Sequence, residues 1–211
     1  TTLGEWLDRW LTVYKKGQVK QGKYESYETN IEAHIKPELG DIPLANLQPN
    51  TLQSFFNDKL EHGRKDGSAL STRMVRYFYT IINQALKQAV KEGLLTRNVA
   101  EATNPPTIRN KKVNPLTEKQ VVTFLEHVKH DRLFPAYLLA ATTGVRRGEL
   151  LGLCWDSVDL ENGAITIQRQ LSTLKSGLVL EETTKSESGR RKITLTDDAL
   201  KELKSHRVRQ L

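Results

Sequence analysis

The first half of the chain spaces its apolar side chains three and four residues apart, the pattern of helices that pack on one core. In the opening segment, Thr2 and Glu5 also have the spacing of a capping box, which marks the start of a helix. Four helices are expected, with starts near Thr2, Ser26, Pro49 and Ser71 and ends near Gly17, Ile35, His62 and Gly93. Residues 1–104 are therefore predicted to form a four-helix unit.

The next segment, residues 105–115, is predicted to be an extended linker. It contains three prolines together with Arg109, Lys111 and Lys112, and it has no acidic residue. An ordinary solvated loop is one interpretation. The charge favours another, a basic strap that lies along a phosphate backbone without reading its sequence.

The second half, residues 116–211, combines helical and strand patterns. Thr117 and Gln120 repeat the capping-box spacing, and Asn162-Gly163 is a strong hairpin-turn signal. Helices are expected at 117–128, 133–143 and 148–155 and again after Thr196, and strands at 164–167, 178–183 and 192–195. The chain is thus expected to be mainly helical, with one small antiparallel β-sheet in its second half.

Charge and cysteine content narrow the class of protein. The 211 residues include 32 Lys and Arg against 25 Asp and Glu, a formal net charge of +7 that attracts polyanions such as nucleic acid. Cys154 is the only cysteine, so no intramolecular disulfide or multi-cysteine metal site can form, and a reducing, cytosolic compartment is expected. The most apolar stretch is broken by Pro135 and is too short to cross a membrane, and no signal peptide is visible.

The segment AATTGVRRGELLGL carries the most informative chemistry. A glycine turn lies between two apolar helical patterns and presents Arg146 and Arg147 beside Glu149. An arginine held there by packed neighbours could offer its planar guanidinium to two oxygens of one phosphate. Taken alone, two arginines at a helix start are more often a solvated face.

TGVRRGEL resembles the first catalytic box of the tyrosine recombinases, which include phage and transposon integrases. Residue by residue, the resemblance assigns the catalytic arginine to Arg146 and its acidic supporting residue to Glu149, and it leaves Arg147 at a variable position. Downstream, GLVLEETTKSESGRRKITL resembles the strand–lysine–turn–strand hairpin of the same family, which selects Lys185 as the catalytic lysine. Without the first box, a solvent-facing turn lysine would be the better account.

The resemblance implies phosphoryl transfer in double-stranded DNA. Arg146 would hold the scissile phosphate, Lys185 would protonate the departing 5′ oxygen, and a tyrosine would form a 3′-phosphotyrosine, with no metal or nucleotide cofactor. Further DNA contacts are assigned to the basic linker residues and to Arg190 and Arg191. The implied fold is a helical SAM-like core-binding domain followed by the N-terminal part of an α+β catalytic domain, and full-length members assemble as tetramers on paired DNA sites.

The family's nucleophile has no counterpart in its expected place. All six tyrosines precede both catalytic candidates. They are Tyr14, Tyr24, Tyr27, Tyr77, Tyr79 and Tyr137. His206 and Arg209 have histidine-x-x-arginine spacing but follow Lys185 too soon, so a charged helix face is the better interpretation. The chain is expected to be trimmed at both ends, to lack an arm-binding domain, and to bind DNA without cleaving it.

Three functions are compatible with these patterns. The first is a DNA-breaking and rejoining enzyme of the bacterial cytoplasm, the second a non-catalytic DNA-binding fragment that acts as a regulator or decoy, and the third a helical protein-interaction scaffold. A reading frame that continues into a histidine-x-x-arginine box and a tyrosine would favour the first over the second. Salt-sensitive DNA binding would exclude the third. The resemblance favours the recombinase.

Overall fold

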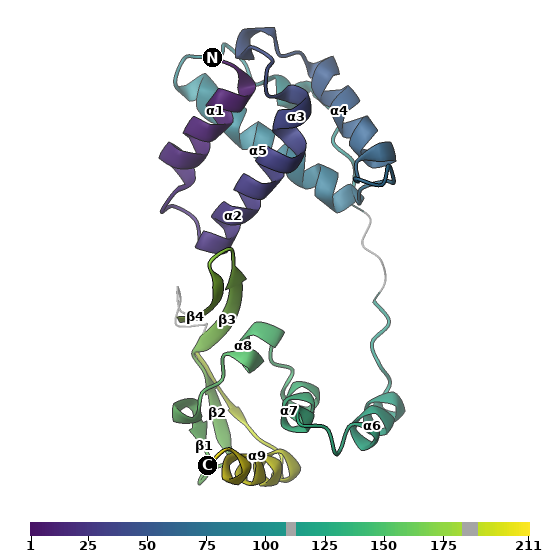
Figure 1. Cartoon of the computed structure of the whole chain (residues 1–211), viewed down its shortest axis with the longest axis vertical. Coiled ribbons are helices and arrows are strands. Elements are labelled where there is room, and N and C mark those ends of the chain that lie inside the picture. Colours follow the sequence, from purple (N-terminus) through teal and green to yellow (C-terminus); the bar gives the residue numbers. More distant parts are fainter. Residues whose placement is uncertain (109–112, 183–189) are drawn as a thin grey trace. The chain divides into compact units, whose positions relative to one another are not determined.

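Residues 1–108, 113–182 and 190–211 are described by the computed structural model, and they fall into two units (Figure 1). The first unit spans Thr1–Lys112 and the second spans Val113–Leu211, and each has its own buried core. The division falls within the segment 105–115, whose role as a linker stays a prediction. None of the helices in the described ranges is long and apolar enough to cross a membrane.

The first unit is built from helices that surround one apolar core. Its helices are α1 (Leu3–Trp10), α2 (Gln21–Asn30), α3 (Lys36–Leu39), α4 (Pro49–His62) and α5 (Thr72–Lys91). Single π-helical turns follow α1 at Leu11–Lys15 and α2 at Ile31–Ile35, and short 3₁₀ turns lie at Leu44–Asn46 and Val99–Ala102.

Large aromatic side chains hold these helices together. Trp6, Trp10, Phe56 and Phe78 are buried, and they come from α1, α4 and α5. The Trp6 indole N–H donates a hydrogen bond to the carbonyl oxygen of Ala85 on α5 at 2.9 Å. α1 is therefore fixed to α5 by a buried hydrogen bond as well as by packing.

The predicted helices of the first unit are confirmed, except that the second starts earlier than expected and continues past Ile35 through α3 to Leu39. The capping box of Thr2 and Glu5 forms at the start of α1. The helix expected from Ser26 begins instead at Gln21. Its first turn is polar and is supported by a hydrogen bond between Gln21 and Glu25, one turn apart, so no apolar period marks it in the sequence.

The second unit, in its described residues, contains four α-helices, a 3₁₀ turn at Trp155–Ser157 and two small sheets. The helices are α6 (Glu118–His127), α7 (Phe134–Thr143), α8 (Arg147–Leu151) and α9 (Asp197–Gln210). Strands β1 (Val158–Asp159), β2 (Ala164–Ile167) and β5 (Arg191–Thr194) form an antiparallel sheet in the order β1-β2-β5. Strands β3 (Arg169–Leu174) and β4 (Gly177–Glu182) form an antiparallel hairpin.

The core of the second unit joins α7 and α9 to the three-stranded sheet. Leu138 and Leu139 come from α7, Ile165 and Ile167 from β2, and Leu203 from α9, and all five are buried. The helices predicted at 117–128 and 133–143 and the strand at 164–167 are confirmed. The elements that frame this core are thus those with the clearest apolar pattern.

The expectation of a single sheet is wrong for the described residues. β4 pairs with β3, with Leu180 opposite Leu171, whereas β5 pairs with β2, with Ile193 opposite Ile165. The sequence predicts no strand at β3, because RQLSTL lacks the alternation of apolar and polar residues that marks a half-buried strand. β4 follows β3 after a short turn, and the low entropy cost of closing that turn favours this local pairing.

α8 and β3 approach each other very closely. A Cβ atom on Gly152 would lie 2.7 Å from the Cα atom of Gln170, and one on Gly148 would lie 3.2 Å from the carbonyl oxygen of Leu171. Real Cβ atoms do not approach another atom as closely as 2.7 Å, so β3 can pack against position 152 only if that residue is glycine. The helix expected over 148–155 is also shortened, since α8 ends at Leu151.

Replacing Gly152 with alanine is expected to destabilise the second unit by about 1–3 kcal/mol, because the added methyl group meets backbone atoms that cannot move aside easily. Gly148→Ala is the matched control. Its contact is looser, and alanine favours a helix over glycine by up to about 1 kcal/mol, so little net loss is expected. Chemical denaturation of both variants measures the difference, and equal stabilities would contradict this account of the packing.

Candidate functional site

A left-handed glycine positions the arginine pair. α7 ends at Thr143, and Gly144 follows with φ 63° and ψ 22°, a conformation that glycine adopts without the strain of a Cβ atom. Val145 is buried and so fixes the chain to the core before the next turn. Arg146 then has an extended backbone and precedes Arg147, the first residue of α8. The glycine turn expected from the sequence is present.

A buried carboxylate, that of Glu149, organises this turn. Its side chain is 5% exposed, and each of its oxygens accepts two hydrogen bonds. Arg146 donates its backbone N–H to Oε2 at 3.0 Å and its Nη1 to Oε1 at 2.9 Å. Arg191, the first residue of β5, donates Nη2 to Oε2 at 2.6 Å and Nη1 to Oε1 at 3.1 Å. One carboxylate therefore joins the start of α8 to the start of β5.

The two arginines keep Glu149 ionised. Hydrogen bonds from Arg191 lower its pKa most, and the backbone and side chain of Arg146 lower it further. Burial acts in the opposite direction, and the net result is a pKa that falls from an ordinary 4.5 to about 2. The hydrogen bonds to Glu149 also raise the pKa of Arg191. With two cations around one anion, the cluster keeps a net positive charge.

The guanidinium of Arg146 is tethered on one side and open on the other. Nη1 is bound to Glu149, yet the side chain as a whole is 80% exposed. The exposed part of a planar guanidinium can donate two parallel hydrogen bonds to phosphate oxygens. The geometry therefore suits recognition of an anion from solvent.

Three of the predicted site residues meet in this cluster: Arg146, Glu149 and Arg191. Arg190, which precedes β5, is exposed. The DNA contact assigned to Arg191 stays a prediction, and so do the roles of Arg146, Glu149 and Arg190. The other predicted site residues lie outside the described residues, and their roles are likewise predictions: Arg109, Lys111, Lys112 and Lys185.

Two ion pairs of this region have no signal in the sequence. Glu149 and Arg191 are 42 residues apart, and only the pairing of β5 with β2 places the arginine. At the start of β3, Arg169 donates from Nη1 to both carboxylate oxygens of Asp156 at 2.7 Å each and so anchors the hairpin. A chain with 32 basic and 25 acidic residues offers many such combinations, so charge and spacing alone do not select these two.

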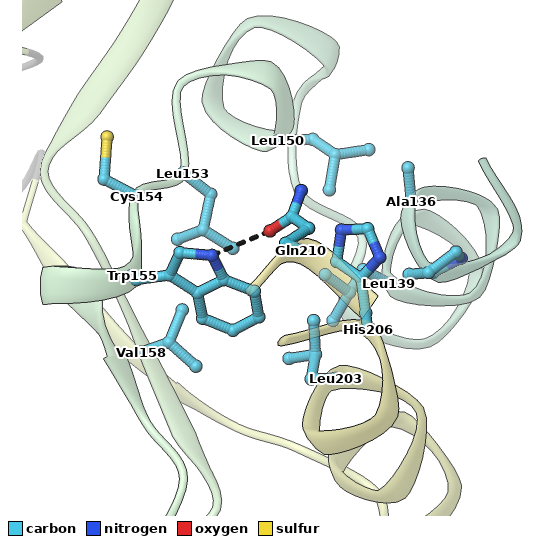
Figure 2. Close-up of a pocket in the computed structure, with 11 residues that line it drawn as sticks. Ala136, Leu139, Leu150, Leu153, Cys154, Trp155, Val158, Leu203, His206 and Gln210 are labelled. Atoms are coloured by element: carbon cyan, nitrogen blue, oxygen red, sulfur yellow. Dashed lines mark hydrogen bonds between the residues drawn. The ribbon is translucent and has the colours of Figure 1, made fainter. Parts of the chain in front are cut away.

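A separate feature of the second unit is an apolar hollow of about 380 Å³ between α7 and α9 (Figure 2). Trp155 lies along it, and its indole N–H donates to Oε1 of Gln210 at 2.9 Å. The His206 ring lies against the same indole, with centroids 6.0 Å apart. These contacts place His206 on the side of α9 that lines the hollow, whereas a charged helix face was expected. Across the described ranges, no group of three His, Cys, Asp or Glu side chains is placed to hold a metal ion.

Glu149 is expected to make the stability of the second unit depend on pH in acid. A carboxyl whose pKa falls on folding contributes stability that is full above its ordinary value of 4.5 and is lost as the pH falls through about 2. The shift corresponds to on the order of 3 kcal/mol. The stability difference between wild type and Glu149→Gln should therefore be largest above pH 5 and should close toward pH 2.

Urea unfolding across this pH range measures that difference. Glu126→Gln, which removes an exposed carboxylate from α6 of the same unit, is the control and should show little pH-dependent difference. A difference for Glu149→Gln that stayed constant down to pH 2 would mean that Glu149 does not stabilise the fold through its charge.

Comparison with known proteins finds relatives of one kind. The family model described as "Phage integrase, N-terminal SAM-like domain" matches residues 2–60. The chain is 25% identical over 224 residues to a "Tyrosine recombinase XerC-like" protein of Caldanaerobacter subterraneus, which covers 99% of this chain and 56% of that protein. It is also 25% identical over 179 residues to the integrase of Escherichia phage lambda, with 82% and 46% covered. The chain thus spans about half the length of the curated relatives it matches.

Solved structures share the fold. The Tn1549 transposon integrase in complex with a circular intermediate DNA has a TM-score of 0.77 at 21% identity, covering 97% of this chain and 64% of that chain. A lambda integrase dimer bound to a COC′ core site has a TM-score of 0.67 at 23% identity, covering 95% and 65%. The predicted fold class, a helical SAM-like domain followed by an α+β domain, is confirmed, although the second unit has two small sheets where one was expected. The matched domain family, the curated relatives and the shared fold show together that this chain is similar to tyrosine recombinases and phage integrases.

Proposed function

We propose that the chain binds double-stranded DNA and holds the reacting phosphate in site-specific recombination, the breaking and rejoining of DNA through a 3′-phosphotyrosine. One observation carries the proposal. The Arg146 side chain is 80% exposed, yet Glu149 holds its guanidinium through Nη1, within a TGVRRGEL segment of a chain that is similar to recombinases. A donor that is already in place does not have to be reoriented when a phosphate arrives, and this is the main requirement of electrostatic catalysis.

The placement of charge explains how such a site would assist phosphoryl transfer. Negative charge grows on the free oxygens of the phosphate and on the departing 5′ oxygen during the reaction. In this proposal Arg146 binds the free oxygens, and Lys185 gives its proton to the 5′ oxygen. Glu149 keeps Arg146 in position, and neither a metal ion nor a nucleotide takes part.

The tyrosine nucleophile of this scheme is not assigned to a tyrosine of the chain. Five of the six belong to the first unit, and in the second unit Tyr137 packs edge-on against Phe124 of α6. We therefore infer that this chain by itself binds DNA without forming a covalent adduct. The full-length protein would act as a tetramer on paired DNA sites in the bacterial cytoplasm. A regulatory or decoy fragment is the alternative, and a reading frame that ends without a further tyrosine would favour it.

Binding of duplex DNA is expected to weaken steeply with salt, because the chain carries a net charge of +7 and phosphate contacts release counterions. Titration of a labelled duplex at several salt concentrations should give a linear fall of log affinity with log salt. A flat response, or no binding at low salt, would contradict DNA binding.

The same titration tests the linker. Glutamine at Arg109, Lys111 and Lys112 together should lower the salt slope by roughly one for each phosphate that is no longer neutralised, and sequence preference should not change. The matched control removes three charges from exposed positions of α9, at Lys201, Lys204 and Arg207. If both triple variants changed the slope equally, the linker would have no special part in binding.

Arg146→Lys should lower strand cleavage by roughly 10²–10³-fold in a full-length protein that carries the family's tyrosine, while site binding changes little. Lysine keeps the charge but loses the planar fork that binds two phosphate oxygens together. Arg147→Lys is the matched control and should cleave nearly normally. Single-turnover cleavage of a suicide substrate measures both variants. If the Arg146 variant were active and the Arg147 variant inactive, the catalytic arginine would be Arg147, and the match of TGVRRGEL to the catalytic box would be wrong by one residue.

A further inference from the structure

Arg191 lies outside the segment that carries Arg146 and Glu149, yet it makes the shortest contact of the cluster, 2.6 Å from Nη2 to Oε2 of Glu149. We propose that Arg191 is a positioning residue: by binding both oxygens of Glu149, it prevents this carboxylate from binding the Arg146 guanidinium through a second nitrogen, so that the rest of the guanidinium stays available to a DNA phosphate. The inference rests on the proposed function and gives one more residue of the same site a role.

Competition for one carboxylate is the first step of the argument. A buried carboxylate needs cationic donors, because an unpaired buried charge costs several kcal/mol. Glu149 is 5% exposed and lies within reach of two guanidinium groups. Without Arg191, the cation left on Glu149 among the residues that the structure describes would be Arg146, three residues away on the same turn. The flexible and exposed Arg146 side chain would then turn its fork inward to satisfy the carboxylate.

The geometry of the contacts supports these different roles, in which Arg191 holds Glu149 and Arg146 stays available to a phosphate. Arg191 uses two nitrogens, one for each oxygen of Glu149, whereas the Arg146 side chain uses only Nη1. Two parallel bonds are the stronger arrangement, so Glu149 is held mainly by Arg191. This leaves Arg146 tethered through a single side-chain bond, with most of its side chain exposed.

The backbone position of Arg191 suits an anchor. Arg191 lies on β5 opposite Ile167, a buried residue of the central strand β2. Its side chain is 36% exposed, compared with 80% for Arg146. A guanidinium on a strand paired with the core can hold Glu149 with little loss of side-chain freedom beyond that already lost on folding. Lysine at this position would keep the charge but could not bind both oxygens in one plane.

A direct contact between Arg191 and DNA is the competing account, and the two make different predictions. If Arg191 acts through Arg146, its removal should matter only while Arg146 is present. If Arg191 binds a phosphate itself, its removal should weaken binding by the same factor whether Arg146 is present or not. A double-mutant cycle separates these cases.

The first experiment needs no DNA. Phenylglyoxal modifies accessible guanidinium groups, and mass spectrometry of the digested chain reports the rate at each arginine. In Arg191→Gln we expect Arg146 to be modified at least about threefold more slowly than in wild type, with Arg147 unchanged as the internal reference. Arg190→Gln removes the same charge one residue away and should leave the Arg146 rate unaltered. Arg191→Lys should slow the modification of Arg146 as Arg191→Gln does. If circular dichroism shows that the glutamine variant is unfolded, the lysine variant is used in its place.

An unchanged Arg146 rate in folded Arg191 variants would overturn the proposal. So would faster modification of Arg146 and Arg147 together, because that result would mean that Arg191 only stabilises the second unit. Slower modification of Arg146 alone would support it.

The second experiment measures the affinity for duplex DNA at low salt of wild type, Arg146→Gln, Arg191→Gln and the double variant. A control cycle uses Arg190→Gln in place of Arg191→Gln. We expect Arg191→Gln to weaken binding about tenfold alone, the size of one charge-assisted hydrogen bond, and less than about twofold when Arg146 is already glutamine. Arg190→Gln should have equal effects in both backgrounds. Additive effects of Arg191 and Arg146 would overturn the proposal. If wild type bound no duplex, the proposed function would fail, and the phenylglyoxal rates would still decide the role of Arg191.

Discussion

The arrangement of the arginine site depends on one buried anion. A carboxylate that is 5% exposed is stable as a charge only if nearby donors replace the water that surrounded it in the unfolded chain, and Glu149 obtains four hydrogen bonds from two arginines. α8 is too short to be stable in isolation, so its first turn relies on contacts of this kind. The carboxylate thus does two things at once. It fixes the start of a short helix, and it links that helix to β5.

Most helices could be predicted from the sequence because the burial of one helix face requires apolar residues at helical spacing. The Leu and Trp residues of α1 recur at helical spacing, and each of them is buried in the first core. β3 has no comparable apolar pattern in its sequence. Most of its side chains are half-buried whichever face they are on, and its pairing with β4 and its packing against Gly148 and Gly152 are tertiary contacts. The polar start of α2 was beyond sequence reasoning for the same reason, since few of its side chains reach the core.

The residues of the candidate site differ in the same way, since some are indicated by local sequence and one is placed only by the fold. Arg146 and Glu149 lie three residues apart, and the glycine turn before them is a local signal, so the sequence indicates both. The contact of Arg191 with Glu149 is made through space, between a helix start and a strand that the fold brings together. Sequence reasoning assigned Arg191 to DNA, because a basic residue after a turn gives no indication of an acidic partner 42 residues earlier.

The distance along the chain between Glu149 and Arg191 also has a kinetic consequence. Contacts between residues far apart in sequence form late, because the entropy of closing the intervening loop must be lost first. With 42 residues between them, these two side chains meet only after β5 has joined β2. Before β5 joins β2, Glu149 would have Arg146 as its partner, so the Arg146 guanidinium would face the carboxylate rather than the solvent. The cluster around Glu149 is completed by β5, so the Arg146 guanidinium is presented to the solvent only once this strand has joined the sheet.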